Sequence, residues 1–205
     1  MNSSGAANAV IVACVWLRQP LLPATRAALR AQLSYGRQLQ LGSAPLRQSQ
    51  TLLGVALACE LLSRVARRPL RAAQVRYTPG GKPYAPGFPE FSISHAGDWV
   101  VCAVARRGAI GVDIEALDEV RTPGVVAAWC SREATLKAAG ARLGELARVQ
   151  GGGRRLQFQG RRWYGHAPRL APGTVLRVVS SHPHARIRML QRPVAQVLAR
   201  QQTSR

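Results

Sequence analysis

Residues 90–115 read EFSISHAGDWVVCAVARRGAIGVDIE and set the fold class, because three extended segments follow one another in this stretch. They are Glu90–Ser94, Asp98–Arg106 and Ala109–Glu115. Arg107-Gly108 separates the last two, and a two-residue connection that contains glycine suits a β-hairpin. We therefore expect strands here, the last two joined as a hairpin.

Helices are expected on both sides of these strands. Ser49–Arg67 has apolar side chains at a period near 3.6, and Pro69 lies just beyond its end. Cys130–Ala139 is expected to form a second helix, which Gly140 closes because glycine readily adopts the left-handed conformation of a helix C-terminus. Ala9–Leu17 is an apolar run too short to span a bilayer, and we interpret it as a buried strand.

A second set of strands is expected after the glycines at 151–153. Four short segments there are expected to form strands that run in alternating, antiparallel directions: Arg155–Phe158, Trp163–Gly165, Val175–Ser180 and Arg186–Leu190. The order of helix and then strands thus occurs twice, which predicts an α+β protein with two lobes that meet near residue 100. With 205 residues, the chain is long enough for two small lobes that share a core.

The chain is strongly basic, with a formal net charge of +20 from 29 basic and nine acidic residues. Such a surface attracts polyanions, whether nucleic acid, an acidic partner protein or a phosphorylated cofactor. The alternative is a compositional bias toward arginine, because Lys82 and Lys137 are the only lysines. No zinc-finger spacing, recognition-helix signature or aromatic–basic stacking motif accompanies the charge, so binding to nucleic acid is the weaker interpretation.

The cysteines are widely separated, and most lie among apolar neighbours: Cys14, Cys59, Cys102 and Cys130. This pattern predicts reduced thiols in the core of a cytoplasmic protein and contains no metal-ligand spacing. The apolar run at 9–17 also lacks the preceding basic segment and the following cleavage site of a signal peptide.

Two carboxylates alternate with apolar residues in Gly111-Val-Asp-Ile-Glu115, at the end of a predicted strand. Side chains two residues apart project from the same face of a strand, so Asp113 and Glu115 are expected to point the same way. Two like charges repel each other unless a cation or a ligand lies between them. The alternative is an exposed strand end whose carboxylates meet surface arginines, and the pentapeptide alone does not decide between the two.

A third carboxylate lies in the second predicted helix, one turn before a lysine. Glu133 and Lys137 are four residues apart, so they project from the same face of the helix. Taken alone, the pair is better explained as a surface ion pair, which contributes only about 0.2–0.5 kcal/mol. The presence of both acidic elements in one short chain favours a functional site instead.

Three stretches together resemble the signature motifs of Sfp-type 4′-phosphopantetheinyl transferases. They are Phe91-Ser-Ile-Ser-His-Ala-Gly-Asp-Trp99, Gly111-Val-Asp-Ile-Glu115, and WCSREATLKAAG from Trp129 to Gly140. The turn Gly80-Gly-Lys-Pro83 resembles the family's Gly-Lys-Pro turn, and Thr51-Leu-Leu-Gly54 resembles its early helix near the adenine nucleotide. The resemblance covers residues 49–140.

The resemblance implies a two-lobed, pseudo-twofold α+β fold in which each lobe is a small, mainly antiparallel sheet packed on helices. An N-terminal lobe at 1–100 would form the nucleotide side of a coenzyme A site. A C-terminal lobe at 101–205 would carry the metal and catalytic motifs.

The resemblance also implies a role for each matching residue. Asp113, Glu115 and Glu133 match the family's Mg²⁺ ligands, which suits an ion that prefers oxygen donors. Glu133 also matches the base for the carrier serine, and Lys137 matches a lysine that stabilises charge on the diphosphate. Positions that contact coenzyme A are matched by Thr51, Lys82, Pro83, Ser94 and His95. Among them, Lys82 matches a lysine that contacts a phosphate, and Ser94 and His95 match a pair that contacts the nucleotide, with the histidine at the 3′-phosphate.

The implied activity is transfer of the 4′-phosphopantetheine arm of coenzyme A to a serine of an acyl or peptidyl carrier protein, with release of adenosine 3′,5′-bisphosphate. The expected partners are coenzyme A and an acidic carrier protein. The protein is expected to be a monomer and not to bind membranes. Early nucleotide contacts would fall to arginines such as Arg30 or Arg37. Only thirteen residues separate Glu115 from Trp129, fewer than in the family. The alternative is therefore a degenerate member that binds coenzyme A or a carrier without turnover.

Overall fold

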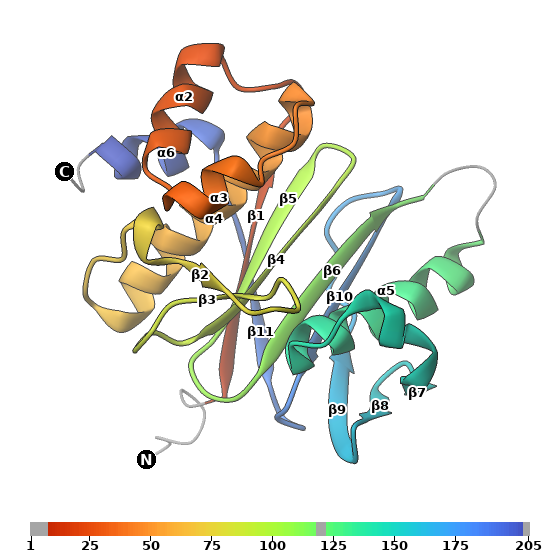
Figure 1. Cartoon of the computed structure of the whole chain (residues 1–205). Helices are drawn as coiled ribbons and strands as arrows, with labels where there is room; N and C mark the ends of the chain where they lie inside the picture. The colour runs from red at the N-terminus through yellow and green to blue at the C-terminus, as the bar shows by residue number, and fades with distance from the viewer. Residues whose placement is uncertain (1–7, 118–121, 203–205) are drawn as a thin grey trace.

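The computed structural model of the protein describes residues 8–117 and 122–202. Within these residues two larger β-sheets pack face to face, and a long helix lies on the outer face of each (Figure 1). The predicted α+β class, with small and mainly antiparallel sheets packed on helices, is confirmed. Part of the short connection before Trp129, at 118–121, lies outside the described residues.

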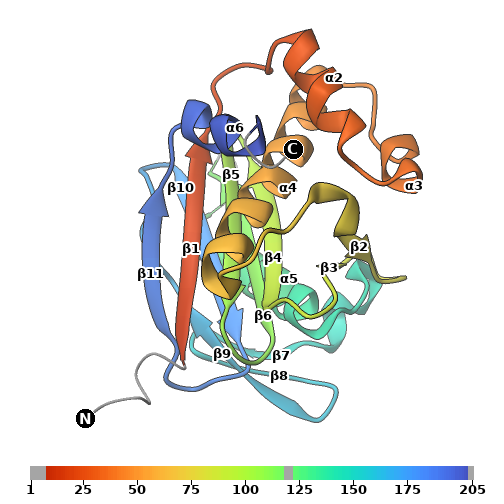
Figure 2. The same cartoon turned by 90° about the vertical axis from the view of Figure 1, so that its left-hand side faces the viewer.

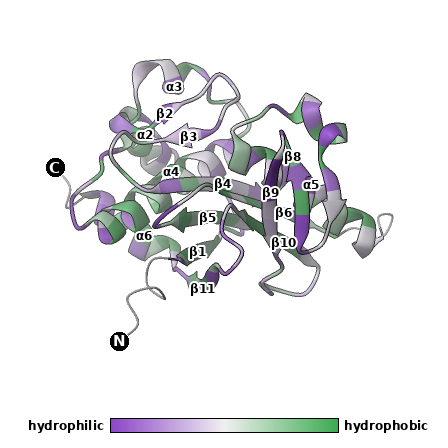
Figure 3. Ribbon diagram, turned by 90° about the horizontal axis from the view of Figure 1, so that it is seen from below, coloured by the Kyte–Doolittle hydropathy of each residue, from purple (hydrophilic) through white to green (hydrophobic). Residues whose placement is uncertain are grey.

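The first sheet has the strand order β11-β1-β5-β4. Its strands are β1 (Ala9–Trp16), β4 (Glu90–Ala96), β5 (Trp99–Ala105) and β11 (Arg186–Gln191). β5 pairs antiparallel with both neighbours, and its sequence WVVCAVA is apolar throughout because both of its faces are buried. The ribbon of β5 is accordingly coloured as hydrophobic over most of its length (Figure 3).

The edge strand β11 joins this sheet from the far end of the chain, beside β1 (Figure 2). It pairs with β1 in parallel, with Ile187 opposite Val10 and Met189 opposite Val12. The expectation that Arg186–Leu190 continues an antiparallel set is therefore wrong, because the alternation within a strand does not encode its partner or direction.

The helix α6 (Val194–Gln202) follows β11 and packs on the long helix α4 (Pro45–Ala66). The sequence patterns did not predict α6. The last described elements thus lie with the first sheet, and β5 spans residue 100. A division into lobes at 1–100 and 101–205 stays a prediction.

The second sheet has the order β6-β10-β9-β8-β7, and its neighbouring strands are antiparallel. Its strands are β6 (Ile110–Ala116), β7 (Gln150–Gly152), β8 (Arg155–Phe158), β9 (Arg161–His166) and β10 (Thr174–Ser180). The expected hairpin of Asp98–Arg106 with Ala109–Glu115 is therefore wrong: β5 pairs with β1 and β4 in the first sheet, whereas β6 pairs with β10 in the second. A short connection with glycine permits a hairpin, but it does not decide which strands pair.

The helix α5 (Pro123–Ala139) packs on the second sheet and begins earlier than expected, at a proline, which the first turn of a helix tolerates well. Gly140 ends α5 with a φ of 71°, as expected of a C-terminal glycine.

Shorter elements surround the end of α4. They are the helices α2 (Pro23–Ala31) and α3 (Tyr35–Leu39), the small sheet of β2 (Arg76–Tyr77) and β3 (Pro83–Tyr84), and the 3₁₀ turn at Ala72–Gln74. A second 3₁₀ turn, Leu143–Arg148, follows α5 and packs against it. The predicted turn at 78–81 connects β2 to β3.

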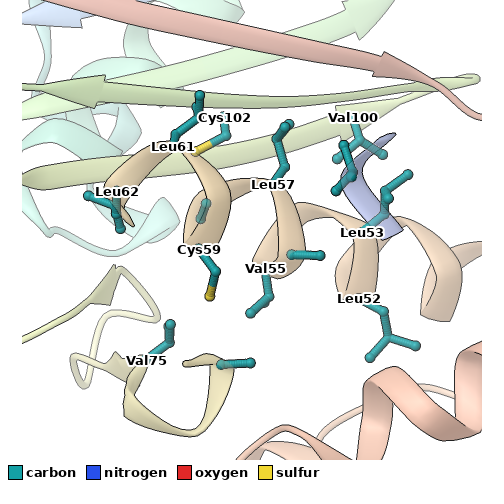
Figure 4. Close-up of a cluster of buried hydrophobic side chains, with 14 of the residues drawn as sticks. Leu52, Leu53, Val55, Leu57, Cys59, Leu61, Leu62, Val75, Val100 and Cys102 are labelled. Carbon is teal, nitrogen blue, oxygen red and sulfur yellow. The ribbon is translucent and has the colours of Figure 1, made fainter. Parts of the chain in front are cut away.

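Separate hydrophobic clusters fill the spaces between the layers. The largest lies between α4 and the first sheet and includes Leu57 and Leu61 (Figure 4). A second lies between the two sheets around Val12 and Val112, and a third lies between α5 and the second sheet around Trp163. The four cysteines are buried and free, which confirms the prediction of reduced core thiols. Among the described helices, none combines the length and the hydrophobicity needed to cross a membrane.

Candidate active site

A cleft of about 280 Å³ lies where β4 and β6 meet α4 and α5. Of the nine residues that the motifs single out, eight line it: Thr51, Pro83, Ser94, His95, Asp113, Glu115, Glu133 and Lys137. They come from elements up to 86 positions apart in the chain, since Thr51 lies on α4 and Lys137 on α5. The fold therefore brings the separate motifs to one place.

Asp113 is the centre of the hydrogen bonds in this cleft. Its Oδ1 atom accepts from the Lys137 ammonium at 2.6 Å and from the Ser94 hydroxyl at 2.9 Å. The ammonium of Lys137 lies 3.0 Å from the same hydroxyl. The other carboxylate oxygen, Oδ2, is buried and has no hydrogen-bond partner. Asp113 thus keeps one strong acceptor for a group that enters the cleft.

Gly111 explains how β6 comes close enough to α5 for these contacts. A Cβ atom at this position would lie 1.9 Å from the carbonyl oxygen of Ala134, a backbone atom that cannot move away alone. Glu133 and Lys137 flank this point of contact on α5. The glycine of the Gly-Val-Asp-Ile-Glu motif therefore sets the distance between the strand carboxylates and the helix side chains.

Glu133 is a partly buried carboxylate beside Lys137, with 3.9 Å between Oε2 and the ammonium nitrogen. Burial raises the pKa of Glu133, the charge of Asp113 raises it further, and Lys137 opposes both effects. A carboxylate with a raised pKa is a better proton acceptor than an ordinary surface carboxylate. Glu115 lines the same cleft from β6, two residues beyond Asp113.

Cationic and hydroxyl groups line another part of the cleft. A guanidinium nitrogen of Arg47 lies 3.1 Å from Nδ1 of His95. Arg37 lines the cleft, and its guanidinium carbon lies 4.3 Å from the centre of the Tyr77 ring. Burial is the main cause that lowers the pKa of His95, and the charge of Arg47 adds to it. The ring is therefore neutral near pH 7.

Comparisons with known proteins identify relatives of one kind. A 4′-phosphopantetheinyl transferase, gsp, of Aneurinibacillus migulanus is 35% identical over 71 residues, which are 35% of this chain and 30% of that protein. The 4′-phosphopantetheinyl transferase Sfp of Bacillus subtilis (strain 168) is 40% identical over 70 residues, 32% of this chain and 30% of that protein. A further 4′-phosphopantetheinyl transferase of Bacillus subtilis is 57% identical over 37 residues, 17% of this chain and 16% of that protein.

The chain is related to the Sfp-type 4′-phosphopantetheinyl transferases. The resemblance inferred from the three motifs is thereby confirmed. The matched segments span less than a third of the length of these curated relatives. No family model matches the sequence.

The oxygen atoms that the carboxylates offer in this cleft fit a magnesium ion. Three carboxylates line it, Mg²⁺ prefers oxygen ligands, and the buried Oδ2 of Asp113 lacks a donor. In the described residues, no group of three or more His, Cys, Asp or Glu side chains already stands in a metal-binding arrangement. The Lys137 ammonium instead holds the Oδ1 atom of Asp113.

Lys82 is the predicted site residue that does not line the cleft. Its ammonium lies 2.5 Å from Oε2 of Glu90 and donates to the carbonyl of Ala138 at 3.0 Å. A Cβ atom at the neighbouring Gly80 would lie 2.7 Å from the carbonyl oxygen of Gly140. The Gly-Gly-Lys-Pro turn of the protein thus packs against the C-terminal end of α5.

Sequence reasoning missed Arg47, although a signal for it was present. Arg47 lies four residues before Thr51, and residues at this spacing share one face of a helix. Of the two early arginines that the sequence analysis named as candidates, Arg37 lines the cleft. Arg30 lies at the end of α2 and is not among the lining residues.

Proposed function

We propose that this protein transfers the 4′-phosphopantetheine arm of coenzyme A to a serine of an acyl or peptidyl carrier protein, and releases adenosine 3′,5′-bisphosphate. The observation that carries the proposal is the convergence of Asp113, Glu133 and Lys137, from a strand and a facing helix, on one cleft. The names of the relatives support a phosphopantetheinyl transfer in general.

In this proposal Asp113, Glu115 and Glu133 would hold a magnesium ion through carboxylate oxygens. When bound, such an ion neutralises charge on the diphosphate and so makes its central phosphate–oxygen bond easier to break. Lys137 already shares an oxygen of Asp113, so its ammonium lies beside the position where the diphosphate would bind. It would hold the negative charge that builds up on the leaving phosphate.

The transfer itself is an in-line substitution at the β-phosphorus of coenzyme A. The serine oxygen of the carrier forms a bond to this phosphorus, and the bond from the phosphorus to the bridging oxygen breaks. Glu133 accepts the serine proton, and the raised pKa of its carboxyl group suits it to do so. The bridging oxygen leaves with adenosine 3′,5′-bisphosphate, which carries the released negative charge.

The remaining predicted residues would bind coenzyme A, with its nucleotide on the side of residues 1–100 and the metal motifs on the side of residues 101–205. Those residues are Thr51, Lys82, Pro83, Ser94 and His95. The cleft volume of about 280 Å³ lies at the lower limit for small-molecule sites, so it would hold part of coenzyme A and leave the pantetheine arm free for transfer. The net charge of +20 would draw an acidic carrier toward the protein. The buried, free cysteines fit a protein that works in the cytoplasm. We propose that it acts as a monomer.

Incubation with apo-carrier proteins, coenzyme A and Mg²⁺ tests the proposal. We expect the carrier to gain the mass of one phosphopantetheine group, and we expect omission of Mg²⁺ or replacement of the carrier serine by alanine to abolish the gain. The variant Glu133→Gln is the matched control, since it removes the proton acceptor and leaves the size of the side chain unchanged. Binding of coenzyme A without any mass gain, across fatty-acid, polyketide and peptide carriers, would instead identify a degenerate member.

A further inference from the structure

A second cavity, of about 820 Å³, lies between β9 and β11. The candidate active site lies where β4 meets β6, each at the edge of its sheet, whereas β11 is the other edge of the first sheet and β9 lies two strands from β6. Among the residues that the structure describes, none lines both cavities. Small-molecule sites have volumes of about 300–1,000 Å³, so the second cavity is large enough for a ligand of its own.

One wall of this second cavity is apolar. Ile187 and Met189 line it from β11, and they lie opposite Val10 and Val12 of β1. All four side chains belong to the hydrophobic cluster between the two sheets. Because side chains two residues apart share a face of a strand, Ile187 and Met189 both face the second sheet. They are only partly buried, so they leave apolar surface open to a ligand.

A glycine on β9 lets a basic turn come close to the opposite wall. The Gly165 N–H donates to the carbonyl of Arg154 at 3.1 Å, and a Cβ atom at Gly165 would collide with the carbonyl oxygen of Gly153. The turn between β7 and β8 therefore packs directly on β9. The positive charge of Arg154 adds to burial in lowering the pKa of His166, which places its guanidinium near this ring.

The wall opposite β11 is cationic. Arg155 lies opposite Tyr164 in the pairing of β8 with β9, and it lines the cavity together with Arg154. Neither arginine forms an ion pair with a described residue, and the described residues that line the cavity include no Asp or Glu. The Nε2 atom of His166 is buried and has no hydrogen-bond partner in the described part of the chain. The positive charge of this wall is thus left unbalanced, and a buried polar atom beside it is left unpaired.

Two walls of this kind suit an organic phosphate. Arginine forks bind phosphate oxygens in pairs, and two adjacent arginines match the two negative charges of a phosphate monoester better than the single charge of a carboxylate. The apolar part of the same ligand would cover Ile187 and Met189. Inorganic phosphate would leave this apolar surface exposed, and a neutral apolar molecule would leave the guanidinium groups without a partner.

We propose that the cavity between β9 and β11 is a second ligand site, which binds an organic phosphate through Arg154 and Arg155 and holds its apolar part on Ile187 and Met189. The inference does not rest on the proposed function, because it concerns a different cavity. It contrasts with a surface of scattered arginines, which would attract any anion and would give β11 no part in binding.

Titration calorimetry with 2-naphthyl phosphate tests this site, because the probe joins a phosphate monoester to an apolar ring system. The salt concentration should be about 0.15 M, which screens scattered surface charges. We expect 2-naphthyl phosphate to bind at least about tenfold more tightly than inorganic phosphate or 2-naphthol. 2-Naphthoate, with a single negative charge, should bind more weakly than the phosphate. Equally tight binding of any of these three compounds would overturn the inference.

A double variant locates the probe. Arg154→Gln combined with Arg155→Gln should weaken binding of 2-naphthyl phosphate about tenfold or more, the effect of losing charged hydrogen bonds. Both side chains are exposed, so the fold should be unaffected. The matched control combines Arg30→Gln with Arg67→Gln, which removes two charges from exposed arginines on α2 and just after α4. The control should bind the probe as the wild type does.

Amide chemical shifts from nuclear magnetic resonance give a readout that does not depend on the variants. Addition of 2-naphthyl phosphate should move the signals of β9 and β11, the strands that form the two walls. Shifts confined to β4, β6 and α5 would place the probe in the candidate active site and overturn the inference. Equal losses of affinity in the two double variants would also overturn it. Neither result would affect the proposed function, which carrier modification tests separately.

Discussion

The ammonium nitrogen of Lys137 lies 2.6 Å from Oδ1 of Asp113, and this pair joins the strand β6 to the helix α5 inside the cleft. The Asp113 carboxylate is almost completely buried, whereas about a third of the Lys137 side chain is exposed. Lys137 can therefore turn toward a bound ligand, and Asp113 cannot move away.

Replacement of this buried carboxylate should abolish transfer. Asp113→Asn keeps the shape of the side chain but removes the negative charge that would hold both Mg²⁺ and Lys137. We expect kcat/KM for carrier modification to fall by at least about 100-fold. The far-ultraviolet circular dichroism spectrum should stay unchanged. Transfer within a few-fold of the wild-type rate would contradict the assignment of Asp113 as a metal ligand.

The chemical nature of the cation at position 137 should matter as well as its charge. Lys137→Arg retains the charge, but a planar guanidinium cannot take the place of a compact ammonium between Asp113 and Ser94, where the contacts are 2.6 and 3.0 Å. We expect kcat to fall about tenfold or more. Steady-state kinetics on one carrier protein measure this loss, and Arg188→Lys on the exposed face of β11 serves as the reverse control. An unchanged kcat would mean that charge alone is required at position 137.

The sequence predicts the local parts of this site well, because helix and strand periods fix which side chains share a face. The spacing of Asp113 and Glu115 on a strand, and of Glu133 and Lys137 on a helix, is of this kind. The contact between Arg47 and His95 cannot be predicted from these periods, because it joins residues 48 positions apart on different elements. The parallel pairing of β1 with β11 was missed for the same reason, since it depends on the path of the whole chain.

The buried thiols should be unreactive in the native protein. Burial raises the pKa of Cys14 to about 11 and that of Cys59 to about 12, and it also raises the pKa values of Cys102 and Cys130. Because the thiolate is the reactive form, a disulfide reagent at about pH 8 should label the native protein slowly and all four cysteines after denaturation. Rapid labelling of any thiol in the native state would contradict the burial.

The same shifts predict how stability depends on pH. Below the unfolded thiol pKa of 9.0 the folded and unfolded states are both protonated, so the thiols do not make the stability depend on pH there. Above this value the unfolded state loses its protons first. We expect the free energy of unfolding, measured by urea denaturation, to fall as the pH rises from about 9 toward 11. A Cys14→Ala variant should show a weaker fall over this range.

Gly111 and Gly124 form a matched pair that tests the contact between β6 and α5. Gly111→Ala places a Cβ atom 1.9 Å from the Ala134 carbonyl, so it should destabilise the fold by about 2 kcal/mol or more and separate Asp113 from Lys137. Gly124→Ala lies in the first turn of α5 with no atom within 4 Å of the added carbon, and it should stabilise the helix by up to about 1 kcal/mol. Urea denaturation and carrier modification should therefore both distinguish the two variants. Equal stability of Gly111→Ala and the wild type would mean that the close approach of α5 does not set the geometry of the site.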